Sequence, residues 1–417
     1  MKIWIFNNYT SLPEHGQFTR SYYFGKNLKK MGQEPVVFAG SHPHNTDTQL
    51  IQGPEKFRVF QENPFPWVLV KTAKYGKNRK KQVLTMFQYY LNGKRAAKWA
   101  AKRYGKPDAI LGSSAHPLAA LLAVRLAKKY KCRSVVEVRD LWPESIVVMG
   151  VAGKYNPAVL FLRRLEKWLY KNADAVVFTM KGAYDYIIER GWEREIPRSK
   201  VFNINNGVEL ESFDENRTRF RLEDPDLDDP DVIKVVYTGS IRLINNIGLL
   251  VDMAKELRNP KIKLLVWGAG NELEALRERV QAEGISNVVF KGFVEKKYIP
   301  SIVSRADINL VHWTMSPLLK YGISYNKLFE YLAGGRPVYS TVRTPYSIIE
   351  PAGCGFATNG FSPKELAEGL DRLAALPAEE LLRMGQNARR TSQEYDFKNL
   401  TRKLLAVMDG SAPPELP

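Results

Sequence analysis

One acidic residue interrupts the apolar pattern of residues 321–338, which read YGISYNKLFEYLAGGRPV. Three apolar side chains recur at helical spacing and should face a core: Leu328, Phe329 and Leu332. We expect Ser324 to cap this helix and Gly334-Gly335 to end it before a strand. Glu330 would then lie on the early turns, where a carboxylate can bind hydroxyls while the helix N-terminus binds phosphate. A solvated surface glutamate is the usual alternative.

Glycine-containing turns follow several strand-like runs, and each leads into a helical pattern. Glycine lets a backbone approach a ligand closely, and the guanidinium of Arg242, near one such turn, suits phosphate oxygens. The segment 289–294 adds a place where a flat base could meet backbone groups. The residues that we expect to bind a donor nucleotide or its diphosphate are Gly16, Gly239, Ser240, Gly268, Gly270, Phe293, Val294, Ser324 and Glu330. Each turn alone is ordinary for an α/β protein.

Short apolar runs alternate with helical patterns along both halves of the chain. The predicted strands are 2–6, 35–39, 57–60, 109–111, 134–138, 175–178 and 201–204, then 232–237, 263–267, 288–290, 308–311, 337–339 and 355–357. Helical patterns include 18–31, 118–130, 158–171, 378–394 and 398–408. This rhythm predicts two doubly wound, Rossmann-like α/β domains with parallel sheets, facing across a cleft at the carboxyl ends of their strands.

An acidic connector at 222–231 separates the two halves. We predict one domain over 1–210 and a second over 211–395. The C-terminal helix, 396–417, should return toward the first domain.

Composition narrows the class of protein. The 417 residues are 44% hydrophobic and 25% charged, which excludes wholesale disorder and favours two domains. The two cysteines, Cys132 and Cys354, are too few and too far apart for a metal site and suggest a reducing compartment. The N-terminus lacks the apolar length of a signal peptide, and no run reaches the roughly 18 apolar residues of a membrane span. We therefore expect a cytoplasmic protein.

The net charge of +18 is concentrated in residues 71–106, which hold twelve basic residues and no acidic one. Aromatic and apolar residues are interleaved with these cations. Such a mixture favours peripheral attachment to the anionic inner face of the cell membrane, through a surface that includes Lys80, Lys81, Lys94 and Lys98. Nucleic acid is a rival polyanion, but no nucleic-acid motif accompanies the charge. A solvated helix face is the simplest alternative.

Together and in this order, these segments resemble the GT-B glycosyltransferases of retaining family 4 over nearly the whole chain. The matching motifs are Asp174-Ala175-Val176-Val177, Asn206-Gly207-Val208-Glu209 with Phe213, Gly268-Ala269-Gly270, Ala306-Asp307-Ile308, and Glu330 with Gly334-Gly335-Arg336-Pro337-Val338. Residues 137–145, EVRDLWPES, are similar to a subgroup that builds bacterial surface polysaccharides and includes O-antigen and capsule aminosugar transferases.

The resemblance implies that the domain over 1–210 binds the acceptor and that the domain over 211–395 binds the nucleotide-sugar. It also implies roles for particular residues. Glu330 corresponds to the acid that holds the ribose of the donor nucleotide, and Gly16 to the loop that approaches the diphosphate. The implied catalytic residues are His116, near the reacting sugar carbon, with Arg242 and Lys327 on the phosphates. The residues assigned to the acceptor or sugar side are His15, Asp140 and Glu144. The implied reaction moves a hexose or N-acetylated aminosugar from a UDP-sugar to a lipid-linked or growing saccharide, with retention.

The chain departs from the family pattern at two positions. Gly322 stands where the first acid of the family's pair is expected, and Ile247 replaces a phosphate-binding lysine. We expect Arg242 or Lys327 to take over that charge. No Asp-x-Asp motif lies in a suitable turn, so we predict neither a metal nor another cofactor. Two rival functions are a UDP-sugar 2-epimerase on the same fold and a non-catalytic basic membrane adaptor.

Overall fold

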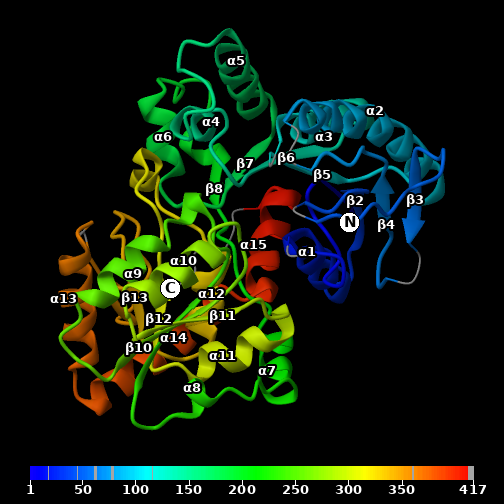
Figure 1. Cartoon of the computed structure of the whole chain (residues 1–417). Helices are drawn as coiled ribbons and strands as arrows, with labels where there is room; N and C mark the ends of the chain where they lie inside the picture. Colours follow the sequence, from blue (N-terminus) through cyan, green and yellow to red (C-terminus); the bar gives the residue numbers. More distant parts are fainter. Residues whose placement is uncertain are drawn as a thin grey trace. The chain divides into compact units, whose positions relative to one another are not determined.

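A computed structural model describes residues 1–16, 18–44, 46–60, 63–76, 79–114, 116–358 and 361–411, except for the side chains of Arg79 and Lys80. The chain divides into two compact units (Figure 1). Unit 1 comprises residues 1–205 and 397–417, and unit 2 comprises residues 206–396. The C-terminal helix α15 (Phe397–Asp409) therefore belongs to unit 1.

Unit 1 is built on an eight-stranded sheet of order β3-β4-β2-β1-β5-β6-β7-β8. Its strands are β1 (Lys2–Asn7), β2 (Glu34–Gly40), β3 (Phe57–Phe60), β4 (Trp67–Val70), β5 (Ala109–Ser113), β6 (Arg133–Val138), β7 (Ala175–Phe178) and β8 (Val201–Asn203). All neighbours are parallel except the edge pair β3 and β4.

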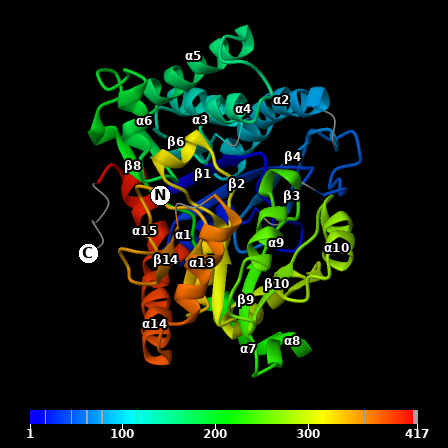
Figure 2. The ribbon, with the colours of Figure 1, turned by 60° about the vertical axis from the view of Figure 1, so that its left-hand side comes forward.

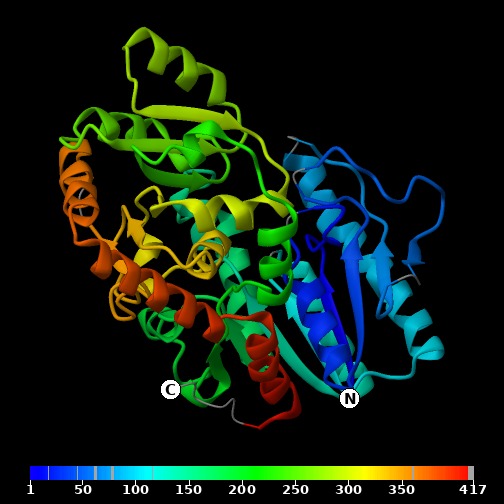
Figure 3. The ribbon, with the colours of Figure 1, turned by 90° about the horizontal axis from the view of Figure 1, so that it is seen from below.

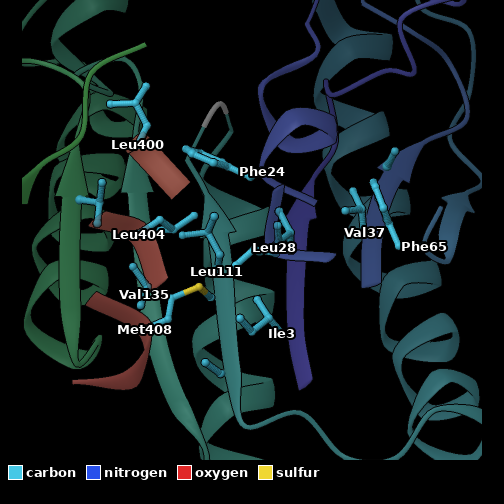
Figure 4. Packing of buried hydrophobic residues seen from close by; sticks show 14 of the residues in the cluster. Ile3, Phe24, Leu28, Val37, Phe65, Leu111, Val135, Leu400, Leu404 and Met408 are labelled. Atoms are coloured by element: carbon cyan, nitrogen blue, oxygen red, sulfur yellow. The ribbon is translucent and has the colours of Figure 1, made fainter. Parts of the chain in front are cut away.

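Helices cover both faces of this sheet. They are α1 (Arg20–Lys30), α2 (Arg79–Arg103), α3 (Pro117–Tyr130), α4 (Glu144–Val148), α5 (Pro157–Asn172), α6 (Ala183–Glu189), the 3-10 turn η1 (Arg198–Lys200) and α15. Helix α15 packs beside α1, so the red and blue helices lie together in Figure 3. Figure 4 shows the resulting core, in which Leu404 and Met408 of α15 meet Leu28 of α1 and Val135 of β6.

Unit 2 has a six-stranded parallel sheet of order β11-β10-β9-β12-β13-β14. Its strands are β9 (Ile233–Thr238), β10 (Ile262–Trp267), β11 (Val288–Gly292), β12 (Ile308–Val311), β13 (Val338–Ser340) and β14 (Gly355–Ala357). Its helices are α7 (Leu210–Arg219), α8 (Pro225–Asp228), α9 (Gly248–Lys255), α10 (Leu273–Ala282), α11 (Ile299–Arg305), α12 (Asn326–Ala333), α13 (Pro363–Ala374) and α14 (Ala378–Glu394). Three 3-10 turns complete it: η2 (Leu243–Asn245), η3 (Lys296–Tyr298) and η4 (Pro317–Tyr321).

The predicted fold class is confirmed, because both units are Rossmann-like α/β layers with parallel sheets. Every predicted strand is present, with ends that differ from the predicted ones by at most two residues. Strand β4 was not predicted.

Each sheet has a point where the strand order reverses, and ligands of doubly wound sheets bind outside the carboxyl ends of the strands at such points. In unit 1 the order runs outward in both directions from the neighbours β1 and β5. In unit 2 the corresponding neighbours are β9 and β12. The loops that follow these four strands are where a ligand is expected.

Candidate functional site

A lysine lies at the reversal point of unit 2. The Nζ of Lys327, in the first turn of α12, donates a hydrogen bond of 2.9 Å to the hydroxyl of Tyr237 in β9. The same nitrogen lies 4.1 Å from the centre of the Tyr237 ring. Burial lowers the pKa of Lys327. A side chain on the neighbouring Gly239 would meet this ammonium, so glycine keeps the space beside it open.

Two hydrogen-bonded side chains hold the surrounding loops in place. The backbone N–H of Thr238, at the end of β9, donates to the Tyr331 hydroxyl of α12 over 2.7 Å. His312, directly after β12, contacts the Thr341 hydroxyl through Nδ1 (2.9 Å) and the Asn246 carbonyl through Nε2 (3.1 Å). Because a carbonyl only accepts, Nε2 carries the proton. Burial lowers the pKa of His312 to about 4, so the ring is neutral near pH 7.

Arg242 and Ser240 lie on the exposed loop after β9. The loop is pinned by Asn245, whose side-chain amide donates to both the carbonyl and the hydroxyl of Ser240. The Arg242 guanidinium forms no ion pair with any residue in the described part of the chain. It is therefore available to an anion near Gly239.

The glycine turn after β10 packs tightly against the loop that follows β9. Side chains at Gly268 and Gly270 would collide with the backbone of Gly239 and Ile241. The two loops are also joined by a 2.9 Å hydrogen bond from the Ile241 N–H to the Ala269 carbonyl. These glycines allow loop-to-loop packing that shapes the Gly239 turn.

Glu330 lies on the second turn of α12, with 21% of its side chain exposed. Its carboxylate lies 3.6 Å from the Nζ of Lys296, on the turn after β11. Phe293, on the same turn, is 68% exposed, and Val294 packs partly against the core. Among the described residues, Glu330 thus forms one loose ion pair, which a ligand could replace.

The prediction that Ser324 caps α12 is wrong. The helix begins at Asn326, and Tyr325 takes the cap position without a side-chain hydrogen bond. The Ser324 hydroxyl instead accepts the backbone N–H of Asn206 over 2.7 Å, and its carbonyl accepts the Asn206 side chain. Residue 206 is far away in the sequence, so local helix rules could not anticipate this bond.

The two departures from the family pattern have physical reasons. Gly322 is buried with φ of +87° and ψ of 173°, a conformation that only glycine adopts without strain. An acid at this position would be strained. Ile247 is fully buried in the core beneath α9, so it makes no polar contact.

In unit 1, His116 lies at the reversal point after β5 and caps α3. Its Nδ1 accepts the backbone N–H of Ala119 over 3.3 Å, which leaves the proton on Nε2. That N–H is buried and has no acceptor among the described residues. The rings of Tyr9 and Tyr89 meet the imidazole edge-on at 5.6 and 5.5 Å. Burial lowers the pKa of His116 to about 3, so it is a neutral donor.

The other residues predicted for unit 1 are spread along the same edge. His15 and Gly16 belong to the loop before α1, where Gly16 packs on the Ser11 side chain. Asp140 is exposed after β6. Glu144 is held by two guanidinium groups, with Nε of Arg163 at 2.8 Å and with Arg190. A sugar contact by Glu144 would have to compete with both arginines.

An aromatic cluster that the sequence analysis missed borders this edge. The Tyr9 ring lies 4.8 Å from that of His44, and the His44 Nδ1 contacts the Tyr75 hydroxyl. The His42 ring lies 4.7 Å from that of Tyr75. These residues follow β1, β2 and β4, so their position directly after strands was the available signal.

The lysines predicted to contact a membrane belong to α2, where Lys81, Lys94 and Lys98 are exposed. The side chain of Lys80 lies outside the described residues. In the described part of the chain, no helix has the length and apolar character needed to span a bilayer. No group of three or more His, Cys, Asp or Glu side chains among those residues is arranged to hold a metal ion.

Residues 15–212 match the family model Glycosyltransferase Family 4, and residues 221–391 match the model Glycosyl transferases group 1. The two halves of the chain thus match two glycosyltransferase family models in tandem. WcaI of Escherichia coli (strain K12), a glycosyl transferase named for colanic acid biosynthesis, is 24% identical over 218 residues, which are 51% of this chain and 52% of WcaI. TuaH of Bacillus subtilis (strain 168), named for teichuronic acid biosynthesis, is 26% identical over 218 residues, or 50% of each chain. The chain thus spans about half the length of the curated relatives it matches.

Solved structures agree over the whole length. Sucrose-phosphate synthase from Thermosynechococcus elongatus superposes with a TM-score of 0.70 at 19% identity, covering 98% of both chains. Anabaena Alr3699/HepE in complex with UDP gives a TM-score of 0.68 at 14% identity, covering 98% of this chain and 99% of that one. At such identities the likeness establishes the fold, which is that of the GT-B glycosyltransferases.

Proposed function

We propose that this glycosyltransferase moves a sugar, a hexose or an N-acetylated aminosugar, from a UDP-sugar to a hydroxyl of a lipid-linked or growing saccharide during the synthesis of a bacterial surface polysaccharide. Family membership and the names of WcaI and TuaH support this class of product. UDP as the donor nucleotide is supported by HepE, solved with UDP and with UDP-glucose, and by an E. coli neighbour solved with UDP-2-fluoro glucose.

The observation that carries the proposal is the cation at the unit 2 reversal point. Lys327 uses one N–H on the Tyr237 hydroxyl, and an ammonium has three donors. Gly239 leaves room beside it, and Arg242, which forms no ion pair with a described residue, lies on the following loop. Two cations around an open turn at the carboxyl end of β9 suit a diphosphate.

In the proposed reaction, the bond from the anomeric carbon to the diphosphate oxygen breaks, and the same carbon bonds to the acceptor oxygen with retention. The acceptor's proton is released, and negative charge develops on the departing diphosphate. Lys327 and Arg242 stabilise that charge, so the proposal needs no metal ion. The Glu330 carboxylate releases Lys296 and accepts hydrogen bonds from the ribose hydroxyls of the donor. The Nε2–H of His116 donates to a sugar hydroxyl, because no described residue accepts this hydrogen.

The enzyme would work at the inner face of the cell membrane, where lipid-linked acceptors are made. The cations of α2 support electrostatic attachment to anionic lipid. No nucleic-acid partner is proposed.

The test is a screen of UDP-, GDP- and ADP-sugars by thermal shift, followed by assays of sugar transfer and UDP release with lipid-linked saccharide acceptors. A donor stabilises the native state in proportion to its affinity, and we expect UDP-sugars to do so. A 2-epimerase would interconvert sugars without an acceptor, and an adaptor would bind vesicles without turnover. Stabilisation by GDP- or ADP-sugars alone would overturn the choice of UDP.

A further inference from the structure

The outer surface of one helix layer in unit 1 carries only one sign of charge. Helix α3 packs between α2 and α5 over one face of the sheet, as Figures 1 and 2 show. The exposed cations of the three helices are Lys81, Lys94, Arg95, Lys98, Lys102, Arg103, Arg125, Lys128, Lys129, Arg164 and Lys171. Their sequences contain a single carboxylate, that of Glu166.

Glu166 does not offset these cations at the surface. It is 5% exposed and accepts hydrogen bonds from the hydroxyls of Tyr170 (2.9 Å) and Tyr186 (2.9 Å). A solvated helix layer usually mixes both signs, because like charges repel each other. A broad surface of one positive sign is complementary to a broad anionic surface.

Exposed apolar side chains occur on the first half of α2. Val83, Leu84, Phe87 and Leu91 are 51%, 50%, 55% and 58% exposed. Residues 84, 87 and 91 recur at helical spacing on one face, which continues into Lys94 and Lys98. Exposed apolar residues that border a polar or charged surface mark an interaction site.

A second exposed apolar group lies between α4 and the start of α5. Met149 is 61% exposed, Val151 44%, Tyr155 76% and Phe161 64%. Residues 145–165 contain no acid but include Lys154, Arg163 and Arg164. Phe161 also continues along α5 into Arg164 and Lys171 at the same helical spacing. The pairing of apolar and basic residues on α2 is therefore repeated at a separate place in the same unit.

We propose that residues 148–161, the α4–α5 segment, insert apolar side chains into the headgroup region of an anionic bilayer as a second anchor beside α2. An interfacial helix binds through buried apolar area together with attraction to anionic lipid. Between the two anchors, α3 presents Arg125, Lys128 and Lys129 to the lipid phosphates. The inference deepens the proposed function, because two anchors hold the unit at the surface that bears the lipid-linked acceptor.

The test compares the full chain with the triple variant Met149→Ser, Val151→Ser, Phe161→Ser by co-sedimentation with phosphatidylcholine vesicles, with and without phosphatidylglycerol. Removing three apolar contacts should weaken binding to the anionic vesicles by about tenfold or more. The loss should persist in high salt, because apolar insertion is not screened. The control variant Ile188→Ser, Leu382→Ser removes two exposed apolar side chains elsewhere, 54% and 62% exposed, and should bind like the parent chain.

Unchanged vesicle binding by the triple variant would overturn the proposal. So would a loss of self-association in sedimentation velocity with vesicle binding intact, since a second copy would then be the occupant of the segment. Hydrolysis of a soluble UDP-sugar should be equal in both chains. If the parent chain binds vesicles through the segment but turns over no donor, the result contradicts the proposed function and still supports the second anchor.

Discussion

In our proposal, the ammonium of Lys327 stabilises the negative charge that develops on the departing diphosphate. Its replacement in Lys327→Ala should lower kcat by about 10²- to 10³-fold with a smaller rise in the donor KM, because the charge it meets grows in the transition state. Lys327→Arg should retain part of the rate. Steady-state kinetics measure both constants. An effect confined to KM would make Lys327 a ground-state binding residue only.

Glu330 gives a prediction about binding instead of rate. A charged acceptor of two ribose hydroxyls contributes about 1.5–3 kcal/mol, so Glu330→Gln should weaken UDP binding by roughly 10- to 100-fold. Isothermal titration calorimetry measures the affinity. Glu295→Gln is the matched control, because Glu295 is an exposed acid paired with Lys297 on the neighbouring turn. Equal affinities of the two variants would remove Glu330 from the site.

Because the buried Nε2–H of His116 is proposed to contact the sugar, its removal should slow sugar transfer without weakening nucleotide binding. Asparagine can still cap α3, so His116→Asn should fold, bind UDP normally and lose about tenfold in transfer rate. Thermal melting, calorimetry and a transfer assay report the three properties. If the transfer loss were matched by a loss of folded protein, His116 would be a structural cap.

The sequence predicted the location of residues at the unit 2 site more accurately than it predicted the role of each residue. Lys327 and Arg242 were predicted as cations, and both lie near the Gly239 turn. The contribution of Tyr237 was missed because a tyrosine in a buried strand looks like core. Ser324 was wrongly predicted to cap α12 because its hydrogen-bond partner, Asn206, is distant in the sequence. Pairings across the fold leave no local pattern.

At the scale of elements, hydrophobic periodicity located the strands because parallel strands buried on both faces are short apolar runs. The exception is β4, which is four residues long and lies close behind Pro64 and Pro66. Its antiparallel partner β3 was found as a strand, but its direction depends on register with β4. Local pattern thus identifies strands, whereas pairing decides their direction.

The packing of α5 against α6 makes stability depend on pH. Burial raises the pKa of Glu166 from 4.5 to about 8, so the folded state holds a proton that the unfolded state has released between these pH values. Stability is fully present below pH 4.5 and falls as pH rises through 8, by about 1.4 kcal/mol per unit at the steepest. His116 affects the free energy of unfolding in the opposite direction. Its pKa is lowered from 6.5 to about 3, so the unfolded state binds a proton first and stability falls as pH falls below 6.5.

The window from pH 6.5 to 8 isolates Glu166, because the buried histidines are neutral in both states above 6.5. Urea unfolding of the parent chain should show stability falling across this window. Glu166→Gln keeps the hydrogen bonds to both tyrosines without a titrating group and should flatten the curve, whereas the exposed Glu193→Gln should not. A parent curve that rises across the window would contradict a neutral, buried Glu166.

At the scale of the molecule, the sequence shows that positive charge is unevenly distributed, and the fold explains how far the basic surface extends. Residues 71–106 supply α2, but α3 and α5 come from later segments, 118–130 and 158–171, that were predicted only as helical patterns. Their cations join those of α2 because successive right-handed crossovers place all three helices on one face of the sheet. The extent of the basic surface could not be read from the charge run alone.

Electrostatic attachment through α2 should respond to charge reversal and to salt. Lys94→Glu with Lys98→Glu changes the charge of this exposed face by four and should lower binding to phosphatidylglycerol vesicles by about tenfold or more at low salt, since each cation contributes about 1 kcal/mol near an anionic surface. Lys261→Glu with Lys364→Glu makes the same change of net charge on exposed residues of unit 2 and should bind almost normally. Raising the salt from 0.1 M to 1 M shortens the Debye length from ~10 Å to ~3 Å and should shrink the difference between the two variants. Equal binding by both variants at low salt would mean that net charge, and not the surface of α2, attracts the protein to lipid.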